Sequence, residues 1–256
     1  MLRFGIVVAV LGTLGCQEPP PDPEVGFDVE QKARALRLIS VFENGTPELQ
    51  YAYVEDLDDG RGLTVGLGFT TATGDALDVV ERYQAEIGDN GLTPYLFELQ
   101  ILAAAESDDT GNLAGFSDAW VAAADDDVFR SVQETVTDVD SYEPALAHAE
   151  ELGLISALPL MVLFDSVWMH GDGDDDDGVP HLIDVTCVDP ADEDAWMRAF
   201  LEVRRSDLLN PADPATQAEW SKAVTRVDAL LDLVDAGNLQ LRGPIEVGRG
   251  YDVVVD

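Results

Sequence analysis

Two acidic residues, Glu43 and Asp59, differ in their surroundings in the way an acid–base pair requires. Glu43 follows Phe42 at the expected C-terminal end of a helix, where the negative helix terminus and partial desolvation disfavour a charged carboxylate. Asp59 stands in a polar turn beside Arg61, which favours the charged form. A protonated acid together with a charged carboxylate is what hydrolysis of a bond between sugars needs. Because the chain has 51 acidic residues, chance pairs are frequent and this pattern alone does not decide the function.

The helix that must carry Glu43 has recognisable ends. Asp28 followed by Gln31 resembles a capping box, and Asn44-Gly45 is typical of a helix stop. Its apolar positions recur at helical spacing: Ala35, Leu36, Leu38, Ile39, Val41 and Phe42.

The segment after Asp59 has a different period. Leu63, Val65, Leu67 and Phe69 alternate with small residues, which predicts a strand with one packed face and one open face that includes Thr64. The two glycines of the open face, Gly66 and Gly68, are typical of a close approach to the backbone or of a bulge or tight bend.

The remaining chain is mostly helical in pattern, which predicts an α+β fold that is mainly α. The segment Leu154–His170 is the most apolar and is expected to be a central buried helix. A short strand is expected at Tyr251–Val255 in an otherwise irregular tail that starts at Asn238. The other expected helices are Asp75–Ile87, Pro94–Ala105, Ser117–Ala124, Val128–Val136, Tyr142–Leu152, Asp192–Leu209 and Pro214–Ala236.

The first 25 residues are expected to be a targeting segment and a tether. Arg3 precedes a short apolar run, Phe4 to Leu14, which is too short to span a bilayer. Gly15-Cys16 resembles a bacterial lipobox, and the proline-rich stretch at 17–23 reads as an extended tether. We therefore expect a secreted or lipid-anchored bacterial protein, in the cell envelope or outside the cell, with one folded domain over residues 26–256. If Cys16 is lipidated, Cys187 is the remaining thiol and no intrachain disulfide forms.

The formal net charge of −37 restricts the partners. Phosphates would meet like charge, so nucleic acid is excluded as a partner. Such a surface attracts polycations, although an acidic surface with two lysines also keeps a protein soluble in brine.

Asp165 and Arg204 are candidates for a buried ion pair. A charged Asp165 inside an apolar helix requires a cation, which Arg204 can supply in bidentate geometry. This pair is either purely structural or supports a nearby site. His170 is expected to be a satisfied buried histidine, and the acidic loop at 171–178 departs from the EF-hand pattern and is expected to be solvated.

Several blocks of sequence, in order from about Glu30 to Leu241, resemble the chitosanases of glycoside hydrolase family 46. The first and most specific group comprises Phe42-Glu43-Asn44, Gln50 to Asp56, Asp59 to Thr64, Gly68-Phe69 and Thr73-Gly74-Asp75. The supporting blocks are Trp168 to Gly171, Phe200 to Arg204 and Ala236 to Leu241.

This resemblance implies a two-lobed, lysozyme-like fold with a small β-sheet lobe, a cleft between the lobes, and a monomer that needs no metal or cofactor. It implies endo-hydrolysis of β-1,4-linked glucosamine in chitosan with inversion. Glu43 matches the acid, Asp59 the base, and Thr64 a residue that helps to hold the attacking water. The remaining matches are Asp75 as a substrate amino-group ligand, and Asp165 and Arg204 as a charge network behind the acid. Glu55 and Arg61, on either side of Asp59 in the sequence, are further candidate substrate contacts.

Two departures leave alternatives open. The segment from Glu43 to Asp59 is shorter than in familiar members, and the region at 187–191 lacks an arginine that the family often has. We therefore expect a reduced charge network. The alternatives are a non-catalytic, polycation-binding lipoprotein on the same fold and a hydrolase that acts on partly acetylated chitin.

Overall fold

The computed structural model describes residues 25–256 with the exception of 213 and 215. The expected leader, its Cys16 and the tether at 17–23 lie outside the described residues. Within the described part, no helix has both the length and the apolar character needed to cross a bilayer.

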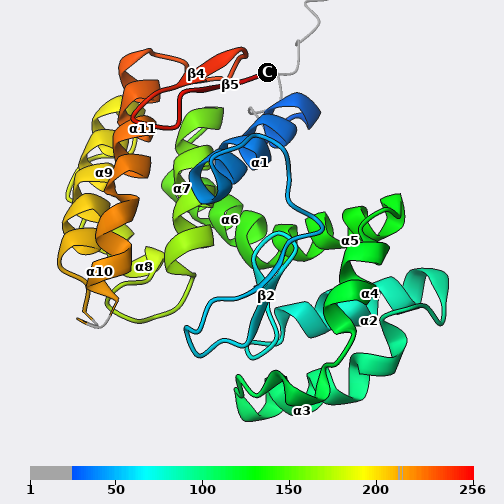
Figure 1. The fold of residues 1–256 in the computed structure, drawn as a ribbon. Helices are drawn as coiled ribbons and strands as arrows, with labels where there is room; N and C mark the ends of the chain where they lie inside the picture. Colours follow the sequence, from blue (N-terminus) through cyan, green and yellow to red (C-terminus); the bar gives the residue numbers. More distant parts are fainter. Residues whose placement is uncertain (1–24, 213, 215) are drawn as a thin grey trace, which may run out of the picture.

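The described chain is mainly helical, as expected (Figure 1). The helices of its N-terminal half are α1 (Val29–Asn44), α2 (Asp75–Ile87), α3 (Leu96–Ala105), α4 (Phe116–Ala123) and α5 (Asp127–Thr137). Those that follow are α6 (Glu143–Leu152), α7 (Ala157–His170), α8 (Val179–Asp184), α9 (Glu193–Leu209), α10 (Gln217–Trp220) and α11 (Val224–Asp235). The strands are β1 (Val54–Asp56), β2 (Leu63–Val65), β3 (Phe69–Thr70), β4 (Ile245–Val247) and β5 (Val253–Val255).

Two separate hydrophobic cores divide the molecule into two lobes (Figure 1). The larger core joins α1 and α6–α9 to α11 and to the antiparallel pair β4–β5. The smaller core joins α2–α5 to the antiparallel sheet β1–β2–β3. The two-lobed α+β fold that the sequence predicted is therefore confirmed.

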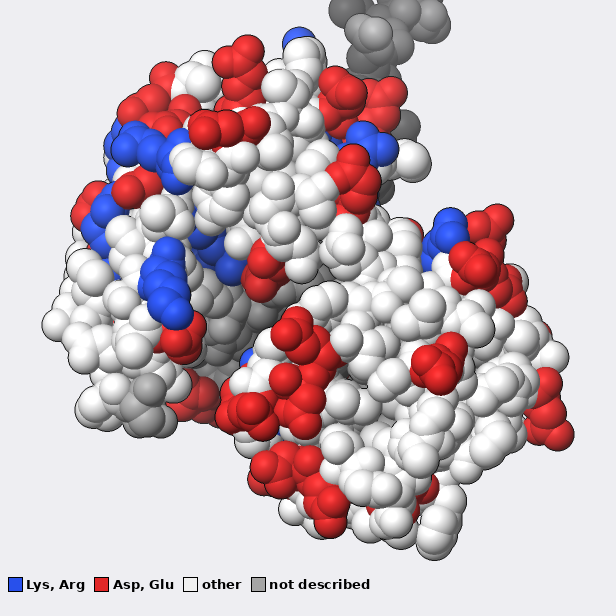
Figure 2. Space-filling view, viewed as in Figure 1, with Lys and Arg blue, Asp and Glu red and all other residues white. Residues whose placement is uncertain are grey.

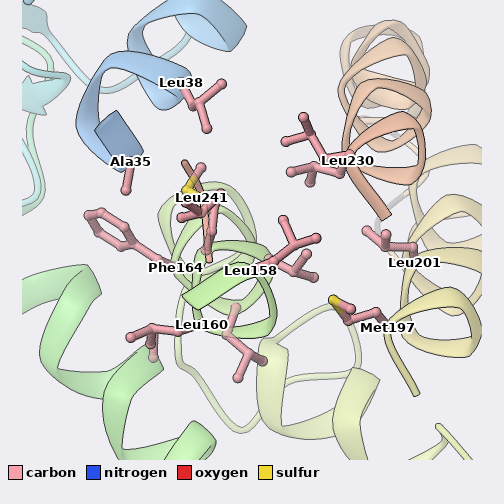
Figure 3. Packing of buried hydrophobic residues seen from close by; sticks show 14 of the residues in the cluster. Ala35, Leu38, Leu158, Leu160, Phe164, Met197, Leu201, Leu230 and Leu241 are labelled. Atoms are coloured by element: carbon pink, nitrogen blue, oxygen red, sulfur yellow. The ribbon is translucent and has the colours of Figure 1, made fainter. Parts of the chain in front are cut away.

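Helix α7 is the centre of the larger lobe, as its apolar sequence predicted. Leu158, Leu160 and Phe164 are no more than 1% exposed. Figure 3 shows these residues surrounded by side chains that point toward α7, among them Leu38 of α1 and Leu230 of α11. This close packing fixes the C-terminal end of α1, where Glu43 lies.

The ends of α1 are as the sequence indicated. The Asp28 carboxylate accepts a hydrogen bond from the backbone N–H of Gln31, whose side chain accepts one from the backbone N–H of Asp28. Gly45 ends the helix in the left-handed conformation, with φ of 70°. The helix therefore ends at Asn44, and Glu43 lies in its last turn, on the side that faces the smaller lobe.

The single strand predicted from Leu63 to Thr70 is wrong. The chain turns back at Gly66–Gly68, so that β2 and β3 form a hairpin, in which Thr64 pairs with Thr70. Gly66 has a φ of 56°, and a Cβ there would collide with the side chain of Gln133. The period-two pattern continued through the turn because alternate glycines suit both a strand and a tight bend.

Four further segments differ from the sequence predictions. The helix expected at Pro214–Ala236 is interrupted by a 3₁₀ turn, Ser221–Ala223, between α10 and α11. Helix α8 and strand β4 were not predicted, since both are short and their patterns are weak. A π-helical turn, Asp138–Tyr142, joins α5 to α6 and was likewise missed.

Candidate active site

A pocket of about 180 Å³ lies between the lobes, beside the end of α1. Figure 2 shows the hollow between the two lobes, with acidic side chains along its edges. The larger lobe contributes α1 and Trp168, and the smaller lobe contributes β2 and its turn. The pocket is lined by Leu36, Ile39, Ser40, Glu43, Asn44, Leu49, Gln50, Tyr53, Leu57, Thr64, Gly66, Leu67, Gly68 and Trp168.

The Glu43 carboxylate faces this pocket on one side and a buried arginine on the other. The Nη2 atom of Arg226 lies 2.5 Å from Oε1 of Glu43. Arg226 is 4% exposed, whereas the Glu43 side chain is 39% exposed. The guanidinium group of Arg226 thus makes a direct ion pair with the Glu43 carboxyl group at the edge of the pocket. The arginine also fixes the orientation of the carboxyl group.

Arg226 connects Glu43 to the pair that the sequence predicted. Its Nε donates to Asp165 at 2.8 Å, and Nη1 of Arg204 donates to the other carboxylate oxygen of Asp165 at 2.6 Å. Both Asp165 and Arg204 are completely buried. The expectation of a reduced network is therefore wrong, because Arg226 of α11 supplies a second guanidinium group.

The network continues to His170 at the end of α7. Its Nε2 accepts a hydrogen bond from Nε of Arg204 at 3.1 Å, and its Nδ1 lies 3.1 Å from the carbonyl oxygen of Asp177. Burial lowers the pKa of His170. A neutral ring with the proton on Nδ1 satisfies both contacts. His170 is thus a satisfied buried histidine, as expected.

The two arginines of the network differ in how their surroundings shift their pKa values. Burial lowers the pKa of Arg204. Burial also acts to lower the pKa of Arg226, but the carboxylates of Asp165 and Glu43 outweigh it and the net direction is upward. Both arginines stay charged, because arginine retains its proton in proteins. Two guanidinium groups and Asp165 leave one positive charge, which the Glu43 carboxylate offsets.

Asp59 is in a very different place. It lies in the turn between β1 and β2, where Arg61 donates to its Oδ2 from Nε at 2.9 Å and from Nη2 at 2.6 Å. These side-chain hydrogen bonds hold the pKa of Asp59 below its usual value. The Asp59 side chain is 30% exposed. Its neighbour Leu57 lines the pocket, but Asp59 does not.

Two other predicted residues of the smaller lobe differ in their relation to the pocket. Thr64 is 8% exposed and lines it, and its hydroxyl has no hydrogen-bond partner among residues 25–256 that the structure describes. Glu55 is exposed and accepts a hydrogen bond from the Tyr53 hydroxyl at 2.5 Å. Tyr53 lines the pocket whereas Glu55 does not. Glu55 therefore does not line the pocket itself but bonds to Tyr53, a residue that does.

Asp75, at the first position of α2, lines a second pocket that continues from the first. The two pockets share Leu67, Gly68 and Trp168, so together they form one groove from Glu43 to Asp75. Burial raises the pKa of Asp75, against the effect of hydrogen bonds from Thr73, from Thr70 and from backbone groups of its own helix start.

The comparisons with known proteins agree with this architecture. Residues 37–245 match the family model of glycosyl hydrolase family 46. The chain belongs to glycosyl hydrolase family 46. It is 49% identical over 230 residues to a chitosanase of Bacillus subtilis (strain 168), a match that covers 87% of this chain and 83% of the relative. It is 32% identical over 230 residues to a chitosanase of Streptomyces sp. (strain N174), covering 86% of this chain and 79% of the relative.

Solved structures of this glycosidase family have the same fold. A mutant chitosanase from Bacillus subtilis MY002, complexed with 6 GlcN, has a TM-score of 0.84 at 46% identity and matches 90% of this chain and 100% of its own. A chitosanase from Gynuella sunshinyii, in complex with chitotetraose, has a TM-score of 0.83 at 42% identity and matches 90% of this chain and 99% of its own. The resemblance to family 46 and the assignment as a glycoside hydrolase are confirmed.

Arg226 is the main residue of this family-46 site that the sequence analysis missed. A signal was present, because Arg226 falls within the apolar pattern of α11 and shares a helix face with Leu230 and Leu233. An arginine at a buried position needs a carboxylate partner. The same argument that singled out Asp165 would have found it.

Three aspartates of the acidic loop at 171–178 make hydrogen bonds, one within the loop and two to other parts of the chain. Asp172 lies 2.5 Å from Nε2 of His148, and Asp175 and Asp177 accept backbone hydrogen bonds. Within residues 25–256, 213 and 215 excepted, no group of three or more histidine, cysteine, aspartate or glutamate side chains could hold a metal ion. Cys187 is exposed and is not in a disulfide.

Proposed function

We propose that this family-46 glycosidase is an endo-acting chitosanase that cleaves β-1,4-glucosaminyl linkages with inversion. The observation that carries the proposal is the groove that leads from Glu43 past Trp168 to Asp75. It offers an acid for one linkage, an apolar surface for a sugar ring, and a carboxylate for an amino group further along the same chain. The chitosanases among the relatives support this choice of substrate.

The charge of the protein suits this substrate. Chitosan carries an ammonium group on most of its sugars under mildly acidic conditions, and the protein has a formal net charge of −37. A surface of this kind raises the local concentration of a polycation and accelerates its capture at low salt. Each exposed ion pair contributes only about 0–1 kcal/mol, so affinity requires several pairs at once.

Glu43 is the proposed general acid. The buried unit of Asp165, Arg204 and Arg226 carries one net positive charge that the Glu43 carboxylate offsets. Transfer of the Glu43 proton to the leaving glycosidic oxygen therefore produces the charge state that the network stabilises. Arg226 also holds the carboxyl group toward the pocket, which keeps the proton donor in line with the linkage.

Asp59 is the proposed general base, and Thr64 helps to orient the attacking water. Asp59 stands outside the pocket lining and pairs with Arg61. The base role therefore requires the turn at 57–62 to move toward the groove when a sugar chain binds. In the complex an inverting pair is about 6.5–9.5 Å apart, which leaves room for one water.

The direct test is chitosan digestion by the wild type and by Glu43→Gln side by side. We expect the wild type to release oligomers and Glu43→Gln to lose at least about a hundredfold in kcat, because loss of a general acid costs roughly 10²–10⁴-fold. Proton NMR of the first product reports the anomer. Absence of cleavage by the wild type across pH and salt, or a first product that retains the β-anomer, would contradict the proposal.

One reason for the first alternative, a non-catalytic lipoprotein, was the missing arginine at 187–191. Arg226 supplies a second guanidinium group to the network, so this reason no longer holds. The hydrolase of partly acetylated chitin is separated by initial rates on chitosan and on neutral chitin oligomers. Faster cleavage of the neutral oligomers would favour it.

We also propose that the protein is exported and anchored through Cys16. The support is the sequence alone: a basic residue, a short apolar run and Gly15-Cys16. Mass spectrometry of the protein from a bacterial membrane fraction should detect diacylglycerol on Cys16. A Cys16→Ser variant should lose the lipid and leave the membrane, and an unmodified, soluble wild type would overturn this proposal.

A further inference from the structure

The second pocket contains a carboxylate that the sequence analysis did not single out. Asp140 lies in the π-helical turn Asp138–Tyr142 and lines this pocket together with Asp75. The pocket has a volume of about 120 Å³, and its other lining residues are Leu67, Gly68, Phe69, Thr137, Ser141 and Trp168. A π-helical turn is rare and often marks a functional position. Two carboxylates therefore share a space that fits part of one sugar.

The two oxygen atoms of Asp75 are used differently. Its Oδ1 accepts hydrogen bonds from the backbone N–H of Thr70 at 2.9 Å, from the hydroxyl of Thr73 at 2.5 Å and from the N–H of Ala76 at 3.1 Å. All three of these hydrogen bonds end on Oδ1, and none of them on Oδ2. One oxygen anchors the side chain, and the other is left for a ligand.

Thr137 adds an independent observation. It is the last residue of α5, it is 2% exposed, and it lines the pocket. Its hydroxyl has no hydrogen-bond partner among the residues the structure describes, whereas Thr135, on the exposed side of the same helix, bonds to the carbonyl oxygen of Ser131 at 2.8 Å. A buried hydroxyl without a partner is unfavourable, so a ligand that bonds to it regains the lost hydrogen bond.

The charges around Asp140 favour a cation. Burial raises the pKa of Asp140, and the negative charges of Asp75 and Asp78 act in the same direction. Arg82 opposes them, but its Nε is bonded to Asp78 at 2.7 Å. The charges that act on Asp140 thus include two carboxylates, Asp75 and Asp78, and one guanidinium group that is paired with Asp78. A bound cation relieves the repulsion between Asp75 and Asp140.

We propose that Asp140 and Thr137 complete an ammonium-binding site with Asp75, and that this site selects glucosamine over N-acetylglucosamine in the second pocket. The proposal rests on the chitosanase function proposed above. An ammonium group has three N–H donors, which match the free Oδ2 of Asp75, the Asp140 carboxylate and the Thr137 hydroxyl. An acetamide is neutral, has one N–H and is larger, so it leaves two carboxylates uncompensated in a small space.

The test compares Asp140→Asn with Asp118→Asn, an exposed aspartate of α4 on the same lobe that makes the same change in charge. Substrates are the glucosamine hexamer and chitosans of increasing acetylation. We expect Asp140→Asn to lower kcat/KM on the hexamer about tenfold, mainly through KM, because hydrogen bonds to charged groups are the strong ones. We expect its preference for deacetylated sugar to fall and Asp118→Asn to match the wild type.

Thr137→Val separates binding from folding. It removes an unpartnered buried hydroxyl at nearly constant volume, so the melting temperature should stay the same or rise while KM for the hexamer rises. Equal kinetics for Asp140→Asn and Asp118→Asn, or equal losses on deacetylated and acetylated substrates, would overturn the inference.

Calorimetry distinguishes failure of the inference from failure of the proposed function. Hexamer binding is measured in the Glu43→Gln protein with and without Asp140→Asn. If the wild type cleaves nothing, the function fails, and weaker binding on adding Asp140→Asn still supports the ammonium site. If the wild type cleaves and binding is unchanged, the function stands and the inference fails.

Discussion

The two proposed catalytic carboxylates are held in opposite ways. Glu43 lies at the end of a packed helix and contacts Arg226, which belongs to a buried network of two arginines and an aspartate. Asp59 lies in an exposed turn, where it pairs with Arg61, two residues further along the chain. The acid is thus tied to the buried interior of the larger lobe through Arg226, whereas the base is held by local contacts.

This difference teaches which of the two groups can move. Displacing Glu43 would uncover a buried charge, which is costly in a medium of low dielectric constant. Displacing Asp59 breaks an exposed ion pair worth at most about 1 kcal/mol. A binding sugar chain can supply that much, so substrate positions the base against an acid that is already in place.

The largest effect is expected when Asp165 is removed from the centre of the network. Asp165→Asn leaves Arg204 and Arg226 side by side without the carboxylate between them, and breaking a buried ion pair in this way costs about 3–5 kcal/mol. For a domain of this size we expect the melting temperature to fall by roughly 10 °C or more in calorimetry.

Asp59→Asn is the matched control for Asp165→Asn, since it makes the same chemical change in the exposed turn. Its stability should stay within about 0.5 kcal/mol of the wild type, as is usual for surface positions, while its activity falls. Similar destabilisation by the two variants would contradict the contrast between the two carboxylates.

A second, smaller effect is expected when each arginine is replaced by lysine. Arg226 bonds to Asp165 through Nε and to Glu43 through Nη2, and one ammonium group cannot reproduce both contacts. Arg226→Lys should therefore lose about 1.5–3 kcal/mol of stability. The misplaced acid should lower kcat by about tenfold to a hundredfold.

Arg61→Lys is the control for that substitution. It keeps the charge beside Asp59 in a solvated turn, so urea denaturation should detect less than about 1 kcal/mol of change. If Arg61→Lys lowers stability as much as Arg226→Lys does, the turn is held more firmly than its contacts indicate.

Much of the larger lobe could be predicted from sequence because its signals are local. The capping box at Asp28 and the stop at Gly45 fixed both ends of α1, and the continuous apolar run of α7 indicated a buried helix. The hairpin of β2 and β3 could not be predicted in this way. Its turn depends on Gln133, which is distant in sequence and leaves no room for a side chain at Gly66.

The residues of the site likewise divide into those that local sequence signals reveal and one that only the tertiary fold reveals. Glu43, Asp59, Thr64 and Asp75 were found because they lie in one block of recognisable motifs near the N-terminal end of the domain. Arg226 lies 183 residues after Glu43, and only the packing of α11 against α7 and α9 brings it there. Its type and its place in an apolar pattern indicated burial, but pairing with Glu43 is a property of the tertiary fold.

The smallest effect concerns the pH dependence of the base. Arg61 holds the pKa of Asp59 below its usual value through its side-chain hydrogen bonds. Asp59 must be ionised to accept a proton from water, so activity fails as pH falls through this pKa. In Arg61→Ala the pKa rises, and the acidic limb of kcat/KM should move to higher pH. On the plateau above that limb, the loss of kcat/KM should be at most about fivefold, because an exposed pair contributes no more than about 1 kcal/mol.

The shift of the acidic limb between the wild type and Arg61→Ala should also shrink in concentrated salt, which screens an exposed pair. An acidic limb that stays in place in Arg61→Ala would mean that Arg61 does not accompany Asp59 in the active form, and that the turn rearranges its ion pair when it reaches the groove.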